Sequence, residues 1–365
     1  MKIAINATPI PAVECGAGVY IIELVQALAK VDSQNEYTIF AKAENKHHFD
    51  PLPPNFQVKY YRLKNRYERL LWEQLHLPRE LEKYQPAVFH SPHYTLPFVT
   101  LKYRKVVTFH DMTFFIFPQY HEWLRQWIFR RIMRRSAQFA DHIITVSENT
   151  KRDLIRLMNV PSNRVTAINS GVSAFFYPPA SPPRNIATPY ILFVGTLEPR
   201  KNLITLIQAF DLLCRECSIP HILKIVGHRG WKYQELFTEV HRRGLEARIE
   251  FTGYVSRPEL RTLYQQADLF VYPSIYEGFG FPPLEAMACG TPAITTTAPA
   301  MSDLFVGGAQ LVEPFDVKAL KTAMQQVLTQ PEWRKQLAQQ GWQLAQTFDW
   351  QHTARKTIAV YQQFA

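Results

Sequence analysis

The chain has 365 residues, enough for two domains of roughly 100–200 residues each. Hydrophobic residues make up 47% and charged residues 20%, which excludes a wholly disordered, collagen-like or disulfide-framework protein. Residues 1–185 hold 24 Lys and Arg against 15 Asp and Glu, a net of +9, whereas residues 186–365 hold 17 against 16. The first half therefore either has a basic surface without a specific partner or binds an anionic partner such as acidic lipid, nucleic acid or substrate.

Cysteine usage and hydropathy indicate in which cellular compartment the protein works. Four cysteines imply no disulfide framework and fit a reducing cytoplasm. Cys214 and Cys217 end a helix-period run and lack a second pair of ligands, so we expect them to pack that helix rather than to bind metal. The first residues do not resemble a signal peptide. The sequence has no run of 18 consecutive apolar residues, so we expect no membrane span.

In the first half, short β-branched runs alternate with helix-period segments, which predicts βαβ units and a parallel sheet. The expected strands are 2–7, 37–41, 87–90, 106–110 and 142–146. A helix is expected at 18–30, and another from Glu148 with Ser147 as its N-cap. The Pro-rich stretch at 177–188 predicts a semi-rigid linker after a first domain at 1–176.

The second half repeats the alternation, which predicts a second domain at 189–347. The expected strands are 190–195, 222–227, 249–253, 269–273 and 293–297. Ser256 and Glu259 form a capping box that opens a helix ending near Ala267. Open α/β sheets bind ligands at the carboxyl ends of their strands. We therefore predict an α/β protein with two doubly wound domains and a binding cleft between them.

The segment Gly16, Ala17 and Gly18 follows the first strand and opens the first helix. Glycines at such a place let backbone amides approach a phosphate. A dinucleotide fingerprint would need a third glycine where Ile21 stands, so NAD binding is not indicated. A tight turn without a ligand is the alternative.

Gly195 and the pair Arg200 and Lys201 follow an apolar strand and precede a helix. Arg can fork onto phosphate oxygens and Lys can act as a point charge, so the pair suits a diphosphate. The Gly-Lys-Ser/Thr ending of a Walker loop is absent. The alternative is a solvated charged turn.

Glu277 and Glu285 lie eight residues apart across a Gly/Pro loop. Pro282 and Pro283 favour a helix start, which places Glu285 in the expected first turn, where its charge complements the helix dipole. These carboxylates could hold sugar or ribose hydroxyls. Two alternatives remain, a glycosidase acid/base pair and a glutamate that only complements the dipole.

His110 and Asp111 end an apolar strand and would project into the cleft. A histidine beside an aspartate can donate to a substrate group or polarise it, although a structural histidine is the alternative. His90 and His93 also end a strand, but without a third ligand they predict no metal site.

The stretch from Trp123 to Arg135 mixes five arginines with aromatic residues. On a helix this pattern is typical of an interfacial membrane binder. The alternative is a core helix whose arginines form its solvent-exposed face. Nucleic-acid binding is not expected, because no recognition motif is present.

Together these segments resemble glycosyltransferase family 4, whose members are retaining enzymes of GT-B fold. The strongest match is 267–292, which contains a Glu-x7-Glu pattern from Glu277 to Glu285 after a strand. Further matches are the loop 194–203, the segment 251–255, the glycine loop 16–20, the segment 108–111 and the terminal segment 348–361.

The resemblance implies two Rossmann-like domains facing a central cleft, and a C-terminal helix at 348–365 that crosses back to the first domain. It implies catalytic roles for His110, Glu277, Arg200 and Lys201. It implies donor binding by Gly16, Ala17, Gly18, Gly195, Gly253, Tyr254, Val255, Gly278, Phe279, Gly280 and Glu285. No cofactor or metal is expected, and no Asp-x-Asp motif is evident near the donor site.

In the mechanism that the resemblance implies, Glu285 binds ribose hydroxyls, while Gly253 and Val255 border the base. Arg200 and Lys201 stabilise the departing diphosphate. Glu277, with the amides of 278–280, holds the donor sugar. His110 contacts that sugar from the other domain, and the leaving phosphate assists deprotonation of the acceptor.

The residues of these motifs most resemble those of bacterial mannosyltransferases of surface-polysaccharide assembly. GDP-mannose is therefore the first expected donor, with UDP-glucose-type donors as the alternative. We expect a saccharide or lipid-linked acceptor and a cytoplasmic protein in peripheral contact with anionic membrane through 123–135. Other classes remain open, namely a nucleotide-sugar epimerase, a glycoside hydrolase using Glu277 and Glu285, and a non-catalytic nucleotide-sugar binder.

Overall fold

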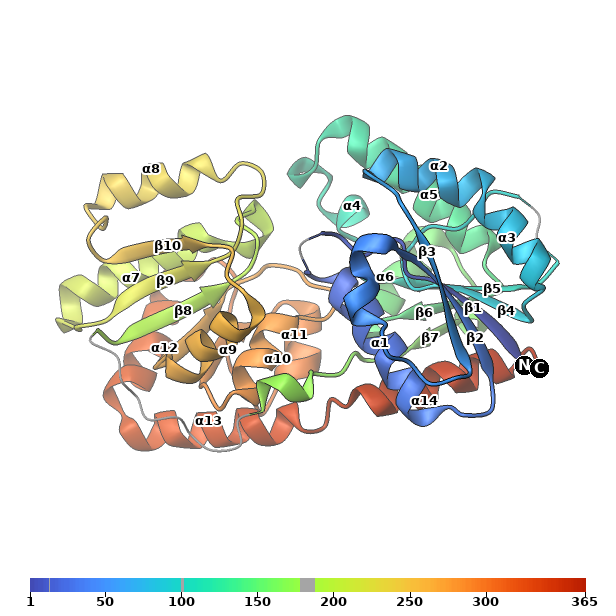
Figure 1. Cartoon of the computed structure of the whole chain (residues 1–365). Coiled ribbons are helices and arrows are strands. Elements are labelled where there is room, and N and C mark those ends of the chain that lie inside the picture. The colour runs from blue at the N-terminus through green and yellow to red at the C-terminus, as the bar shows by residue number, and fades with distance from the viewer. Residues whose placement is uncertain (13, 100–101, 178–187) are drawn as a thin grey trace. The chain divides into compact units, whose positions relative to one another are not determined.

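The computed structural model describes residues 1–12, 14–99, 102–177 and 188–365, and it divides into two compact units (Figure 1). Unit 1 comprises Met1–Gly171 and Asp349–Ala365, and unit 2 comprises Val172–Phe348. This division comes earlier than the predicted boundary at 176, and most of the predicted linker, 178–187, lies outside the described residues. Each unit is built on one parallel sheet, so the predicted α/β class with two Rossmann-like sheets is confirmed.

Unit 1 has a seven-stranded sheet of order β3-β2-β1-β4-β5-β6-β7, in which every pairing is parallel. Its strands are β1 (Lys2–Asn6), β2 (Glu36–Lys42), β3 (Phe56–Tyr61), β4 (Val88–Ser91), β5 (Arg104–Phe109), β6 (His142–Thr145) and β7 (Val165–Ala167). The strand order reverses between β1 and β4, which is the switch point where open sheets of this kind bind ligands. The edge strands β3 and β7 were not predicted, because one is mostly half-exposed and the other is very short.

The helical segments of unit 1 are α1 (Ala17–Val31), η1 (Ala43–His48), α2 (Arg66–Leu75), α3 (Leu77–Tyr84), α4 (Thr113–Ile116), η2 (Pro118–Tyr120), α5 (Trp123–Phe139), α6 (Glu148–Met158), η3 (Ser162–Arg164) and α14 (Trp350–Gln362). The predicted cap of α6 is confirmed, because the Ser147 side chain accepts a hydrogen bond from the Thr150 amide. Among the described residues, no helix combines the length and the apolar character that a membrane crossing requires.

Unit 2 has a six-stranded parallel sheet of order β10-β9-β8-β11-β12-β13, with its switch point between β8 and β11. Its strands are β8 (Tyr190–Val194), β9 (Ile222–Val226), β10 (Ile249–Gly253), β11 (Leu269–Tyr272), β12 (Ala293–Thr296) and β13 (Gln310–Val312). Its helical segments are η4 (Ala174–Phe176), η5 (Pro199–Lys201), α7 (Leu203–Cys217), α8 (Gln234–Arg243), α9 (Arg257–Gln266), α10 (Phe281–Ala288), α11 (Pro299–Phe305), α12 (Val317–Thr329) and α13 (Pro331–Ala345). The predicted capping box of Ser256 and Glu259 is present at the start of α9.

The central strands of both sheets are buried on both faces. Every residue of β4, β8, β11 and β12 is buried, which explains why β8 and β11 read as apolar runs without alternation. The helices that cover the faces therefore leave the loops at the carboxyl ends of the strands as the places where polar side chains can gather.

The last helix, α14, belongs to unit 1 and lies beside α1 (Figure 1). The Trp350 ring meets Tyr20 of α1 edge-on, with ring centroids 5.6 Å apart. The Tyr361 hydroxyl lies 2.6 Å from Nδ1 of His90, whose Nε2 lies 2.9 Å from the Thr108 hydroxyl. Burial lowers the pKa of His90 to about 3, so this histidine is neutral and has hydrogen-bond partners at both ring nitrogens.

We predict that Tyr361→Phe destabilises unit 1 by about 1–3 kcal/mol, because it leaves a buried ring nitrogen of His90 without its partner. Urea denaturation would measure the loss. Gln362→Ala, an exposed change on the same helix, should unfold like wild type. Equal stability of the two variants would show that the contact does not hold α14 in place.

Candidate functional site

Within unit 2, the loops that carry predicted donor residues meet at the carboxyl edge of the sheet. Gly195 follows β8, and η5 with Arg200 and Lys201 comes next along the chain. Glu277 lies in the loop after β11. Because β8 and β11 are paired and flank the switch point, the two loops lie side by side. The backbone joins them as well, since the Ile275 amide donates to the Arg200 carbonyl at 3.0 Å.

Glu277 is the centre of a buried ionic cluster. Its Oε2 lies 2.6 Å from Nη1 of Arg200, and its Oε1 lies 2.5 Å from Nζ of Lys201. The hydroxyls of Ser274 and Tyr272 also donate to Oε1, at 2.6 and 3.0 Å. The carboxylate therefore faces two cations and two hydroxyl donors, and it holds all of them in one arrangement.

The cations of this cluster have further partners that the sequence analysis did not identify. Glu198 pairs with Arg200 at 2.5 Å, and the Tyr276 carbonyl accepts from Nη1 of Arg200 at 2.6 Å. Lys201 also donates to the Tyr272 hydroxyl at 2.5 Å. Two carboxylates thus balance two cations. Glu198 lies next to Pro199, so nothing in the linear pattern distinguishes it from a solvated turn residue.

The electrostatics of the cluster keep Glu277 ionised. Burial raises the pKa of Glu277, but Arg200 and Lys201 more than offset it and bring the pKa to about 2. Burial, together with the neighbouring Arg200, lowers the pKa of Lys201, while Glu277 and Glu198 oppose that change. Glu277 is therefore ionised at neutral pH, which does not match the raised pKa of a glycoside-hydrolase general acid.

The loop after β11 ends in a glycine that the packing requires. Gly280 has φ 101° and is the N-cap of α10, and a Cβ there would lie 2.7 Å from Cε of Met301. Gly278, Phe279 and Gly280 are all buried. This segment therefore has a fixed backbone directly after Glu277.

The expected position of Glu285 is wrong in one respect. Helix α10 begins at Phe281, before the two prolines, so Glu285 lies beyond the first turn, which contains no acidic residue. The dipole argument for this carboxylate therefore does not apply. Glu285 instead accepts a hydrogen bond from the Tyr264 hydroxyl at 2.9 Å and is half-buried.

The segment 253–255 begins with the last residue of β10, at the same edge of the sheet. Tyr254 is 55% exposed, and Gly253 and Val255 are half-buried. The Gly227 amide at the end of β9 donates to the Gly253 carbonyl at 2.9 Å. A Cβ at Gly227 would lie 2.0 Å from the carbonyl oxygen of Gly195, so this glycine, which the sequence analysis did not single out, lets the strand ends approach.

In unit 1 the predicted glycine loop follows β1. Gly16 is the exposed N-cap of α1 with φ 48°, and its surroundings are open. Gly18 is buried, and a Cβ there would lie 2.6 Å from Cδ of Pro11. Packing against Pro11 thus explains why position 18 is a glycine, whereas Gly16 and Ala17 are accessible.

His110 follows β5 and is half-buried against Tyr20, with ring centroids 4.9 Å apart. Burial lowers its pKa, so the ring is neutral at neutral pH. Nε2 lies 3.0 Å from the Pro92 carbonyl, which can only accept, so Nε2 carries the proton. Nδ1 then has the lone pair and can accept a hydrogen bond from a hydroxyl. Asp111 Oδ1 accepts from the amide and hydroxyl of Thr113, at 2.9 and 2.6 Å.

A buried polar network supports this edge of the unit 1 sheet and was not predicted. Glu73 is fully buried, and its Oε2 accepts from Arg69 at 2.7 Å, from Thr95 at 2.9 Å and from Asn6 at 3.3 Å. Asn6 ends β1, and Thr95 follows β4, so the network joins the two strands of the switch point. An Arg and a Glu four residues apart on a helix usually indicate a surface ion pair. The sequence alone therefore does not reveal that Arg69 and Glu73 belong to a buried network.

Family models match both parts of the chain. "Glycosyltransferase Family 4" matches residues 15–174, and "Glycosyl transferases group 1" matches residues 180–343. The O-antigen chain mannosyltransferase B of Escherichia coli is 34% identical over 99% of this chain and 99% of its own length. The O-antigen chain mannosyltransferase RfbU of Salmonella typhimurium is 31% identical over 66% of this chain and 65% of its own.

Solved structures share the fold at low identity. Sucrose-phosphate synthase from Thermosynechococcus elongatus aligns with a TM-score of 0.79 and 22% identity, over 99% of this chain and 98% of its own. Anabaena HepE in complex with UDP-glucose aligns with a TM-score of 0.77 and 18% identity, over the whole of both chains.

We predict that Glu277→Gln destabilises unit 2 by about 3 kcal/mol at pH 7, because it removes the carboxylate that the buried Lys201 shares with Arg200. A carboxyl whose pKa is lowered on folding, here from 4.5 to about 2, adds stability above the unfolded value and loses it as pH falls through the folded value. The difference between wild type and variant should therefore shrink as pH falls below about 4.5. Urea denaturation between about pH 7 and pH 3 would measure it.

Glu313→Gln, which removes an exposed carboxylate of the same unit, is the matched control and should follow the wild-type profile. A Glu277→Gln difference that stays constant across this pH range would contradict the ionised cluster.

Proposed function

The chain belongs to glycosyltransferase family 4, and we propose that it transfers mannose from GDP-mannose to a saccharide or lipid-linked saccharide, with retention of anomeric configuration. Two relatives that are O-antigen mannosyltransferases support mannose as the sugar. The observation that carries the proposal is the cluster of Arg200, Lys201 and Glu277 at the switch point of unit 2. A sugar transfer from a nucleoside diphosphate needs fixed positive charge where the leaving group departs.

In this proposal the donor binds to the carboxyl edge of the unit 2 sheet. Arg200 and Lys201 stabilise the negative charge that develops on the diphosphate, and Glu277 positions both cations. The glycine-rich segment 278–280 holds the sugar, Glu285 the ribose, and 253–255 the base. We propose that these two protein cations, rather than a metal ion, stabilise the departing diphosphate, and that transfer needs no other cofactor.

Unit 1 binds the acceptor in this proposal. His110 accepts a hydrogen bond from a sugar hydroxyl through Nδ1, since its Nε2–H points to the Pro92 carbonyl. Gly16 and Ala17 present accessible backbone at the start of α1, where amides can bind a phosphate. No side-chain nucleophile is required, because the leaving phosphate assists deprotonation of the acceptor.

The outer face of α5 supports a peripheral contact with an anionic membrane. Trp123 and Trp127 are 77% and 55% exposed and lie on one face of the helix with the exposed Leu124. The Arg131 guanidinium lies over the Trp127 ring at 4.7 Å. Exposed aromatic and basic side chains on one helix are typical of binding at a lipid interface. We propose that the protein works in the cytoplasm at the inner face of the membrane, where a lipid-linked acceptor would be presented.

We predict that GDP and GDP-mannose raise the Tm of the protein in EDTA, whereas UDP, ADP, dTDP and their sugar conjugates do so weakly. A ligand at 100 times its Kd adds about 2.7 kcal/mol of stability.

Arg200→Ala should lower kcat by about 100-fold or more with GDP-mannose, because it removes a cation at the leaving group.

Arg215→Ala is the matched control, since Arg215 is an ion-paired arginine of the same unit on α7. It should keep both the GDP-induced shift and the turnover. A shift with UDP alone would replace mannose by a UDP-sugar donor. No shift with any nucleotide, in folded protein, would overturn the proposal. The anomeric configuration of the first-formed product, read by NMR, would decide between retention and inversion.

We predict that Trp123→Ser/Trp127→Ser weakens binding to phosphatidylglycerol vesicles by about tenfold or more, since burial of both rings is lost. Co-sedimentation with vesicles would measure the binding, with phosphatidylcholine vesicles for comparison. Trp342→Ser, which removes a 42% exposed tryptophan on α13 of the other unit, should bind like wild type. Equal binding by all variants would contradict the contact through α5.

A further inference from the structure

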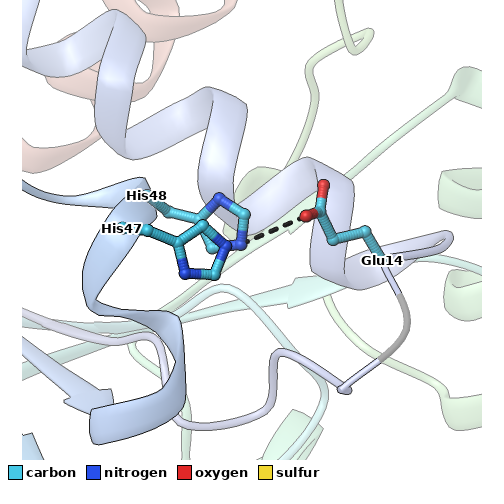
Figure 2. Close-up of side chains that lie close together, drawn as sticks. All are labelled: Glu14, His47 and His48. Atoms are coloured by element: carbon cyan, nitrogen blue, oxygen red, sulfur yellow. Dashed lines mark ion pairs between the residues drawn. The ribbon is translucent and has the colours of Figure 1, made fainter. Parts of the chain in front are cut away.

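Three side chains of unit 1 lie close together (Figure 2). Glu14, His47 and His48 each offer one ligand atom, and these atoms all lie within 4.8 Å of one another. We propose that these three residues form a binding site for a transition-metal dication of the Zn²⁺ class. Neither the family match nor the relatives assign a role to this cluster.

The fold brings the three residues together at one edge of the sheet. β1 and β2 are paired in parallel, so the segments that follow them start at the same edge. Glu14 lies in the segment after β1, two residues before the N-cap of α1, and His47 and His48 end η1, which follows β2. Residues that are more than 30 positions apart in sequence thus face one another.

The η1 side of the site has a fixed backbone. The Gln26 side chain of α1 donates to the His48 carbonyl at 3.1 Å, and the next residue, Phe49, is buried. The Phe49 amide closes η1 by donating to the Lys46 carbonyl at 3.0 Å. The two histidines therefore project from a turn that is anchored both to α1 and to the core.

The ligand spacing fits a small dication. Nε2 of His48 lies 3.3 Å from Oε1 of Glu14. Zinc bonds of about 2.0–2.1 Å give a distance of about 3.3 Å between two ligand atoms of a tetrahedron. The rings of His47 and His48 lie with centroids 3.9 Å apart. His47 is exposed while the other two are half-buried, so an ion can enter from solvent and keep a water molecule as its fourth ligand.

The donor set selects the class of metal. Two imidazoles and one carboxylate suit Zn²⁺, Cu²⁺ and Ni²⁺, whereas Mg²⁺ and Ca²⁺ prefer sites made of oxygen ligands. Lysines of the same segment do not oppose an ion strongly, because Lys46 pairs with Asp50 at 3.7 Å and Lys42 with Glu44 at 2.5 Å.

A bound ion would tie the segment that carries Gly16 to η1. It would thereby restrict the loop from which we propose that backbone amides approach the donor. This consequence rests on the proposed function, whereas the binding of metal does not.

Isothermal titration of the full chain, purified without a polyhistidine tag, with ZnCl₂ tests the site. We expect one Zn²⁺ per chain. Glu14→Gln, His47→Ala and His48→Gln should each lower the affinity by about tenfold or more. MgCl₂ should give no comparable binding. Because Glu14 and His48 are half-buried, the Tm of each metal-free variant is measured as well, which separates loss of binding from loss of fold.

Two controls make the assignment specific. His241→Gln breaks an exposed pair with Glu246, 2.6 Å apart, that offers only two ligands, and it should leave the affinity unchanged. Cys15→Ser removes the exposed thiol next to Glu14 and should do the same. The proposal is overturned if wild type binds no Zn²⁺, if the three site variants bind like wild type, or if Cys15→Ser loses as much affinity as Glu14→Gln. Such a result would overturn the metal site without bearing on nucleotide binding. The proposed function is therefore tested separately, by nucleotide binding.

Discussion

The interaction on which the candidate site depends is the neutralisation of two cations by one buried carboxylate. Arg200 and Lys201 follow β8, and Glu277 follows β11, so the pairing of these two strands sets the distance between opposite charges. A buried lysine without a partner would lose its proton or unfold the site. Glu277 opposes the fall in the pKa of Lys201 that burial causes, and charge in such a buried environment acts most strongly on a leaving group.

The same constraint explains why the polar residues of both units lie where they do. Parallel strands buried on both faces carry mostly apolar side chains, so the charged residues of these clusters lie beyond the strands. In unit 1, Glu73 with its partners Arg69 and Asn6 occupies the end of β1. In unit 2 the Glu277 cluster occupies the corresponding place between β8 and β11. Each unit thus uses a buried carboxylate at its switch point, and the carboxylate fixes the loops that meet there.

Hydrophobic runs and capping residues made the fold predictable, because both act within a few residues of sequence. The strands around Ile5, Val107, Phe193 and Val271 and the capping box at Ser256 are where the pattern places them. The short edge strand β7 was missed, since three residues give no period. The site was predicted as a set of motifs, but not its contacts. Glu198 and Glu73 act through partners that only the folded chain brings near, and the start of α10 at Phe281 changes the position of Glu285.

The basic surplus of the first half can be traced in part to packing. On α5, Arg130 donates to the Phe114 carbonyl at 2.8 Å, Arg131 lies over Trp127, and Arg135 lies over Phe98. Arginine can stack on a ring and still present its charge to water, which lysine does less well. Two interpretations of this helix were open: a core helix whose arginines form its solvent-exposed face, and a helix that binds anionic lipid. They are compatible, because the same guanidinium covers a ring on one side and faces solvent on the other. Net charge alone could not have shown this, since it counts the guanidinium without the ring beneath it.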